Sequence, residues 1–165
     1  MNKTRLFYTQ SGKKISDLAK YIREYMEKDN TAQYEIYVGC DSQVNRIHTI
    51  YSVAVGIRRV TDGIGRGVHV IHTREKERKY DESRGGIFTR LWKEVEKLAE
   101  VSEYLRDNGF NVTEFEAHVD ANENEKFASN MIKDSAIGYL RGRGFNVQIK
   151  PNAFAATYAA NRFCK

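Results

Sequence analysis

The order of β-rich and helical segments is the feature that most constrains the fold of this chain. Three β-rich segments come first, at Tyr34–Val38, His48–Val60 and Val68–Ile71, and the last two flank a glycine-rich turn. Two more β segments, ending near Asp120 and Ile149, each follow a helical segment. Hairpins make antiparallel strand pairs and helical crossovers make parallel ones. The order predicts an α/β fold with a mixed five-stranded sheet, three antiparallel strands and then two parallel crossover strands, flanked by helices.

Four helices are expected around this sheet. The first has apolar residues at helical spacing, and Ser16 with Asp17 can cap it. The second should end at Gly109, because glycine is favoured just after a helix. The helices are expected at about 15–29, Ile87–Asn108, Asn130–Arg141 and from Asn152 to the last residue.

The length and the lack of linkers predict one domain over residues 1–165, with the N-terminal helix of about 15–29 preceding the sheet. A chain of 165 residues can bury roughly two-thirds of its unfolded surface. Pro151 is the only proline, and no low-complexity stretch divides the sequence. We therefore expect a single hydrophobic core.

Charge and cysteine usage narrow the class of protein. The net charge of +5 suits a polyanionic partner such as nucleic acid without requiring one. Two cysteines fit a reducing compartment, and Cys40 is expected to be a small buried side chain rather than a nucleophile. Residues 1–30 match neither a secretory signal nor a membrane span. We expect a cytoplasmic protein with no membrane partner, of undetermined oligomeric state.

Two aspartates follow apolar β runs in the same way. Asp41 follows Val38 by three residues, and Asp120 comes directly after Val119. Ligands of open α/β sheets bind beyond the carboxyl ends of the strands, so two strand-closing carboxylates can converge there. A pair of fixed carboxylates suits a magnesium or manganese ion.

The chain resembles the YkuK family of ribonuclease H-like proteins from about Tyr34 onward. The resemblance is carried by four segments, of which the last is the most specific: Gly39-Cys40-Asp41-Ser42-Gln43, His118-Val119-Asp120-Ala121-Asn122, Ser129-Asn130 and Lys150-Pro151-Asn152-Ala153-Phe154-Ala155-Ala156-Thr157. The superfamily cleaves or transfers phosphodiesters with carboxylates that hold two divalent ions. The resemblance implies this fold and a candidate metal site.

On this resemblance, Asp41 and Asp120 take the first and third acidic positions of the superfamily. The alternative for Asp41 is a turn aspartate that caps Ser42 and Gln43, and the alternative for Asp120 is a loop aspartate before Asn122. If two Mg²⁺ or Mn²⁺ ions bind, about 3.5–4 Å apart, Asp41 is the natural bridge between them. One ion would then activate the attacking water and the other would stabilise the leaving oxygen.

The second acidic position should be a glutamate on the long helix. At about 100° per residue, Glu94 lies at the edge of the apolar face, whereas Glu96, Glu100 and Glu103 point away from it. A charged residue beside an apolar stripe needs a partner. That partner is either a metal ion or a surface pairing with Arg90 or Lys97.

The fourth position departs from the superfamily pattern, where an aspartate often stands near the last helix. Asn152 and, further along, Asn161 are the matching residues here. An amide oxygen can bind magnesium but lacks the charge, so we expect one tighter and one weaker metal position. Asn152 is also a candidate N-cap of the last helix.

The remaining candidates would contact substrate or move a proton. Lys150, Gln43 and Asn122 are candidate substrate-binding residues, although a lysine before proline is also often only solvated. His118 is a possible proton relay or metal ligand, with a structural histidine as the alternative.

Two other motifs favour non-functional interpretations. Gly63, Gly65 and Gly67 lie between two expected strands and precede no helix, which indicates a hairpin turn rather than a phosphate loop. The segment Arg74–Lys79 mixes both charge signs and is typical of a solvated loop rather than a basic stripe. Other arginines are scattered and could line a groove only through the fold.

The leading hypothesis is a metal-dependent phosphodiesterase, a nuclease that acts on RNA, DNA or an RNA:DNA hybrid by a two-metal mechanism. It rests on the convergence of Asp41, Glu94 and Asp120. The alternative is a non-catalytic nucleic-acid-binding module on the same scaffold, suggested by Asn152 in place of a carboxylate. A third possibility is an interaction protein that uses neither property.

Overall fold

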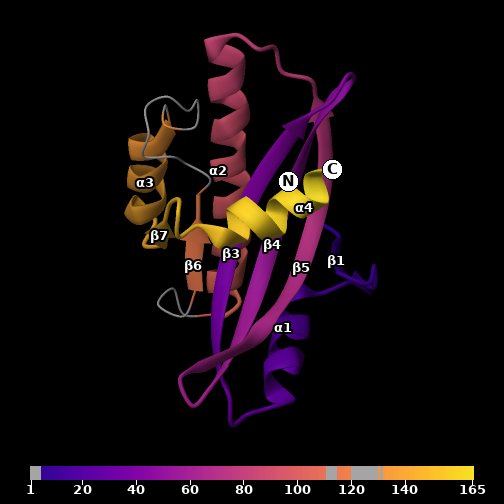
Figure 1. The fold of residues 1–165 in the computed structure, drawn as a ribbon, viewed down its shortest axis with the longest axis vertical. Helices are drawn as coiled ribbons and strands as arrows, with labels where there is room; N and C mark the ends of the chain where they lie inside the picture. The colour runs from indigo at the N-terminus through magenta and orange to yellow at the C-terminus, as the bar shows by residue number, and fades with distance from the viewer. Residues whose placement is uncertain (1–4, 111–114, 120–129, 131) are drawn as a thin grey trace.

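The computed structural model describes residues 5–110, 115–119, 130 and 132–165 and contains one mixed sheet with helices on both faces (Figure 1). The strand order is β2-β1-β5-β4-β3-β6-β7. The strands are β1 (Phe7–Thr9), β2 (Lys14–Ile15), β3 (Gln33–Val44), β4 (His48–Thr61), β5 (Ile64–Arg78), β6 (Phe115–His118) and β7 (Asn146–Gln148).

The five expected strands are all present, in the expected pairing. β3, β4 and β5 pair antiparallel, β6 lies parallel to β3, and β7 lies parallel to β6. The predicted number of strands is wrong, because the described residues form a sheet of seven strands. The additional hairpin of β1 and β2 joins β5 through the pairs Tyr8 with His72 and Thr9 with Ile71. Strands of three and two residues are too short for a periodic pattern to reveal.

The glycine-rich segment is a hairpin turn, as expected. Thr61 pairs with Ile64, so Asp62 and Gly63 form a two-residue turn between β4 and β5. Both have positive φ, 51° and 73°. This backbone suits the right-handed twist of a hairpin and favours Asp-Gly.

Asp41 does not close its strand, contrary to the prediction. β3 continues to Val44, and β4 pairs with it from Ser52, opposite Asp41, to Thr49, opposite Val44. The sequence Ser42-Gln43-Val44 has little apolar character, and its strand conformation depends on the long hairpin with β4. Asp41 therefore lies inside a paired strand.

The helices are α1 (Leu18–Glu27), α2 (Arg84–Asp107), α3 (Lys133–Gly142), the π-helix η2 (Ala155–Ala160) and α4 (Asn161–Cys164). Asp17 caps α1 by accepting a hydrogen bond from the N–H of Lys20, at 2.9 Å. α2 ends before Gly109, whose φ of 88° lets Phe110 bond back to the carbonyl of Leu105. No helix in the described ranges is long and apolar enough to span a bilayer.

The last helical segment begins later than expected, so Asn152 is not its N-cap. Asn152 lies in a turn, where its N–H bonds to the carbonyl of Ile149 at 2.9 Å. η2 begins at Ala155, and the residue before it, Phe154, makes no side-chain capping bond. Asn152 therefore belongs to the turn before η2 and does not cap it.

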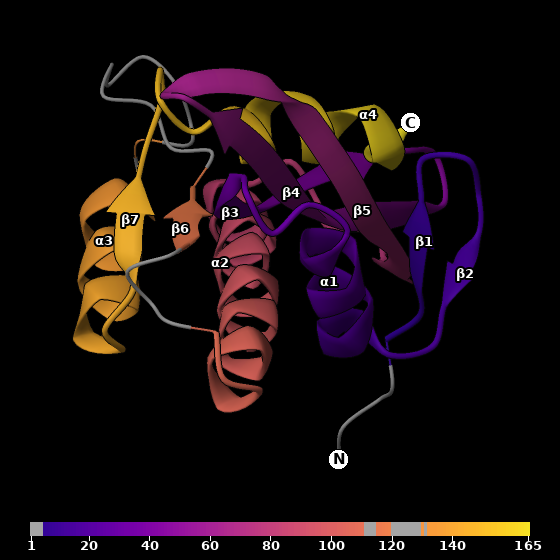
Figure 2. The same ribbon diagram turned by 90° about the horizontal axis from the view of Figure 1, so that it is seen from below.

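The helices form two unequal layers, as Figure 2 shows: α1, α2 and α3 cover one face of the sheet, and the C-terminal helix of η2 and α4 crosses the other. The main core fills the first face, where Leu98 and Leu105 of α2 pack with Ile57 and Val55 of β4. A small second cluster of Ala54, Val70 and Ala160 lies under the C-terminal helix. The sheet is thus buried on both sides where β3, β4 and β5 run together.

Replacing Leu98 by alanine tests this packing. Leu98 is buried in the main core, and truncating a core leucine leaves a cavity. We expect Leu98→Ala to lower the free energy of unfolding by about 2–5 kcal/mol in urea titrations. Glu96→Ala, at an exposed position of the same helix, should change it by less than about 0.5 kcal/mol. Equal effects of the two variants would contradict the assignment of the core.

Candidate functional site

Two carboxylates meet at one serine of β3. Ser42 donates its backbone N–H to Oδ1 of Asp41 at 2.8 Å and its hydroxyl to Oε1 of Glu94 at 2.5 Å. Asp41 is 7% exposed and Glu94 is 5% exposed. Successive strand residues point to opposite faces, so Ser42 faces α2 and Asp41 faces the C-terminal helix. Ser42 therefore contacts carboxylates on the two sides of β3. Its bond to Asp41 is the local capping contact named above as the alternative for Asp41, made here within a strand and not in a turn.

Arg90 brings a positive charge to this group, one helical turn before Glu94. Its Nη1 atom donates to the hydroxyl of Ser42 at 2.7 Å and to the Ser42 carbonyl at 3.2 Å, and lies 3.6 Å from Oε1 of Glu94. Of the two pairings left open by the sequence, the structure has the one with Arg90, whereas Lys97 binds glutamates of β5. The nearby cation offsets part of the cost of burying Glu94.

The helical phase of α2 singles out Glu94, as the sequence predicts. Glu96 and Glu100 are exposed, and Glu103 is only half-buried and pairs with Arg143. Glu94 is the one α2 glutamate that the sheet buries. The position of Glu94 at the edge of the apolar face was therefore sufficient to predict that this side chain faces the sheet.

β6 ends beside the strand that carries Asp41. Its last residue, His118, pairs with Gly39, and no described strand covers this side of β3 beyond that pair. Asp120 follows His118 by two residues in the sequence, as Asp41 follows Gly39. Asp120 and Asn122 lie outside the described residues.

The donor chemistry of Asp41 and Glu94 fits a hard divalent cation. Carboxylate oxygens are the ligands that Mg²⁺ and Mn²⁺ prefer in proteins. Within the described ranges, no three side chains of histidine, cysteine, aspartate or glutamate are grouped so that they could hold a metal ion. The described part of the site thus provides two carboxylates, and a complete metal site needs a further ligand.

Two buried thiols lie against the same stretch of β3. The Sγ atom of Cys164 donates to the carbonyl of Asp41 at 3.1 Å, and the Sγ atom of Cys40 lies 3.9 Å from the same oxygen. Burial raises the pKa of both thiols, and the charges of Asp41 and Glu94 raise both further; the pKa of Cys164 reaches about 12. Both carboxylates therefore act on both thiols, which keeps the thiols protonated and unreactive.

His118 is completely buried and connects β6 to the C-terminal helix. Its Nδ1 atom accepts a hydrogen bond from the N–H of Ala155 at 3.1 Å. Its ring packs against Tyr37 and Phe154, with centroids 5.0 and 4.8 Å away. These contacts correspond to the structural role that the sequence analysis gave as the alternative to a proton relay or metal ligand. They hold the start of η2 over β3.

The structure describes three further candidate residues, Gln43, Lys150 and Asn152. Gln43 is exposed, two residues after Asp41, and lines a shallow pocket with Asn45, Ile50, Cys164 and Lys165. In the turn between β7 and η2, Lys150 is half-buried and Asn152 is exposed.

Sequence reasoning missed the connecting part of the site. Ser42 appeared only as a residue that Asp41 might cap, and Arg90 only as one of two surface partners of Glu94. A serine in a strand or an arginine in a helix does not by itself indicate a contact with two carboxylates. The link arises from the packing of α2 on β3, which brings residues 48 positions apart into contact.

The single mixed sheet with its flanking helices is consistent with a ribonuclease H-like fold. The family model described as "Ribonuclease H-like" matches residues 17–165, and the chain belongs to this family. A curated relative is the "Uncharacterized protein YkuK" of Bacillus subtilis (strain 168), which is 25% identical over 97% of each chain. The resemblance to the YkuK family is thereby confirmed. No solved structure gives a significant match.

A double-mutant cycle tests the coupling between Arg90 and Glu94. Arg90→Met leaves a buried carboxylate without its nearby cation, so we expect a loss of about 1–3 kcal/mol in the free energy of unfolding, measured in urea. In the background of Glu94→Gln, the same replacement should cost at least 0.5 kcal/mol less. Additive effects of the two changes would show that the ion pair does not stabilise the fold.

The raised pKa of Cys164 predicts how stability depends on pH. A thiol whose pKa is higher in the folded chain stabilises the fold below the pKa of the unfolded chain, and this contribution is lost as the pH rises toward 12. Between pH 9.5 and 11, Cys164→Ala should therefore reduce the decline in unfolding free energy by up to about 1.4 kcal/mol per pH unit. Equal slopes for both proteins in urea titrations would contradict a raised pKa.

Proposed function

We propose that the protein is a divalent-metal-dependent phosphodiesterase that acts on nucleic acid. The observation that carries the proposal is the meeting of Asp41 and Glu94 at Ser42, beside the end of β6. The family match adds support, because ribonuclease H-like proteins act on phosphodiesters. The positive net charge of +5 suits a polyanionic substrate.

Asp41 and Glu94 would hold Mg²⁺ or Mn²⁺, with Asp120 as the third carboxylate and Asn152 as a weaker neutral ligand. The bound metal would supply Lewis acidity and activate water for attack on the phosphodiester. Asp120 is proposed from its place in the sequence, two residues after β6, whose last residue pairs with Gly39 on the strand of Asp41. The two-metal arrangement belongs to the same proposal.

The chain's own residues prepare the site for this chemistry. Ser42 holds both carboxylates by hydrogen bonds and fixes their orientation. Arg90 neutralises Glu94 before a cation binds. Gln43 and Lys150 are proposed to contact substrate, together with Asn122. The Nδ1 atom of His118 already accepts a hydrogen bond from Ala155, so a proton relay would have to use its Nε2 atom.

A non-catalytic nucleic-acid-binding module is the second candidate. The ion pair of Arg90 with Glu94 favours it, because the guanidinium already supplies a positive charge where a metal ion would. The two candidates share the scaffold and the polyanionic ligand. They differ in whether the bound nucleic acid is cleaved.

Substitution of the carboxylates tests the catalytic proposal. Asp41→Asn, Glu94→Gln and Asp120→Asn should each lower cleavage of labelled RNA, DNA or RNA:DNA hybrid in Mn²⁺ by about 100-fold or more, or about 2.7 kcal/mol of transition-state stabilisation. Removal of the metal with EDTA should abolish cleavage. The matched control is Glu96→Gln, at an exposed position on the same helix, which should retain activity within about 2-fold.

Circular dichroism of each variant should establish that the fold is retained. Cleavage that persists in folded Asp41→Asn and Asp120→Asn would remove these residues from the mechanism. Binding of nucleic acid without cleavage in any divalent metal would leave the binding module as the function.

A further inference from the structure

The segment Arg74–Arg78 is a strand in which the two charge signs are separated, not the mixed solvated loop that its sequence indicates. It forms the end of β5 and pairs with β4 from Ser52 to His48. Successive side chains of a strand point to opposite faces. The alternating sequence Arg-Glu-Lys-Glu-Arg therefore places its glutamates on one face of the sheet and its basic residues on the other.

The glutamates face α2, where basic side chains neutralise them. Glu75 forms ion pairs with Arg5 and Lys97, the first at 2.5 Å and the second at 2.6 Å. Glu77 forms ion pairs with Lys93 at 2.6 Å and with Lys97 at 2.7 Å. The negative charge of this segment is thus used inside the protein.

The basic residues Arg74, Lys76 and Arg78 are exposed on the opposite face, and together they are called the β5 basic stripe. No aspartate or glutamate side chain of the described residues forms an ion pair with any of them. Arg74 donates to the main-chain oxygen of Lys165 at 2.8 Å, and the guanidinium of Arg78 lies 5.2 Å from the ring of Tyr80. The positive charges of Lys76 and Arg78 are therefore available to an external ligand.

Strand register places the stripe on the same face as Asp41. Asp41 pairs with Ser52, which pairs with Arg74, and paired residues point to the same side of the sheet. In the same way, Gln43 pairs with Ile50 and Ile50 pairs with Lys76, so Gln43 and Lys76 also point to this face. Neighbouring strands lie about 4.8 Å apart, so the stripe runs about 10 Å from the strand of Asp41 and parallel to it.

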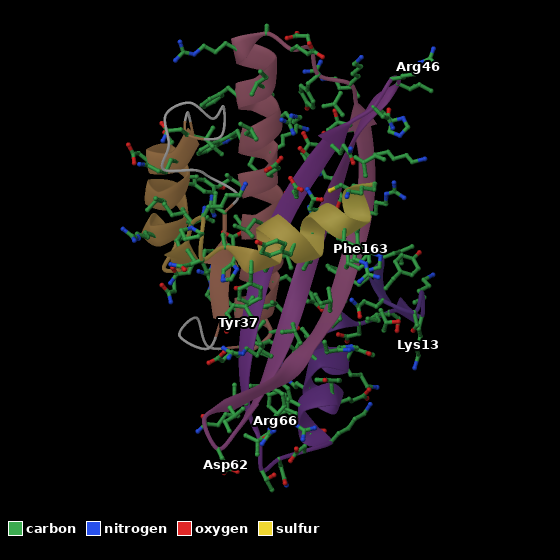
Figure 3. All side chains as sticks on the ribbon, in the orientation of Figure 1. Lys13, Tyr37, Arg46, Asp62, Arg66 and Phe163 are labelled. Atoms are coloured by element: carbon green, nitrogen blue, oxygen red, sulfur yellow. The ribbon has the colours of Figure 1, made fainter. Side chains whose placement is uncertain are left out.

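A shallow pocket lies next to the stripe. Gln43, Asn45, Ile50, Cys164 and Lys165 line it. Ile50 is the cross-strand neighbour of Lys76. Figure 3 shows Arg46 beyond this region, at the tip of the β3–β4 hairpin.

We propose that the β5 basic stripe binds the phosphodiester backbone of the nucleic acid and directs the strand toward Asp41. The proposal rests on the proposed function for the identity of the ligand. Residues two apart in a strand are about 7 Å apart, so the stripe extends over about 14 Å. Basic side chains at this spacing contact phosphates and carry no information about bases, so binding should be independent of sequence.

The test compares two double variants that remove the same charge. Lys76→Ala/Arg78→Ala removes two residues of the stripe. Lys13→Ala/Lys14→Ala removes two exposed lysines of the β1–β2 hairpin, where Figure 3 labels Lys13. Binding of a fluorescent 20-mer, single-stranded and as a duplex, is followed by anisotropy in EDTA, so that no cleavage occurs. Cleavage in Mn²⁺ is measured separately.

We expect the stripe variant to raise the Kd at least about 10-fold and to lower the slope of log Kd against log salt by about 1.5, because two phosphate contacts are lost. The lysine control should change the Kd less than about 3-fold. A stripe effect without cleavage by the wild-type protein would support the stripe and reject the nuclease. Equal binding by the two variants, with Asp41-dependent cleavage intact, would overturn the stripe and leave the nuclease standing.

Two further results would also overturn the stripe. One is the absence of nucleic-acid binding by the wild-type protein at low salt. The other is unchanged binding with increased self-association of the stripe variant. That result would assign the basic residues to protection of a free strand edge against aggregation.

Discussion

The hydrogen bonds of Ser42 to both Asp41 and Glu94 are the interaction on which the site depends. The bond to Asp41 joins adjacent residues, whereas the bond to Glu94 forms because β3 continues past Asp41 to Val44 and turns the Ser42 side chain toward α2. A buried carboxylate without a partner is costly. Ser42 and Arg90 reduce that cost for Glu94 through their hydrogen bond and ion pair with its carboxylate.

The same alternation of side chains organises the charge of the molecule. On β5 it turns the glutamates toward the lysines of α2 and leaves the basic residues on the face of Asp41. On β3 it turns Tyr37 toward Phe154, at 4.5 Å between ring centroids, and so helps to hold the C-terminal helix over the sheet. The candidate site and the basic surface therefore follow from one geometric property of strands.

Local patterns in the sequence were sufficient for the features that depend on short-range physics. Helical phase identified Glu94, the Asp-Gly turn was recognised as a hairpin, and the order of segments predicted the five central strands. Features that depend on distant partners were missed. Ser42 contacts Glu94 because α2 packs on β3. The glutamates at the end of β5 form ion pairs with Lys93 and Lys97 of α2, which are distant in the sequence. β1 is too short to be recognised without its pairing to β5.

The most direct measurement of the central claim is a crystal structure of the wild-type protein soaked in Mn²⁺, with anomalous difference maps. The account predicts at least one manganese peak within coordination distance, about 2.0–2.3 Å, of carboxylate oxygens of Asp41 and Glu94, with Asp120 as a further ligand and Arg90 displaced from Glu94. Manganese peaks only at other sites, with the Ser42 and Arg90 contacts of Glu94 unchanged, would contradict a metal-dependent function for this site.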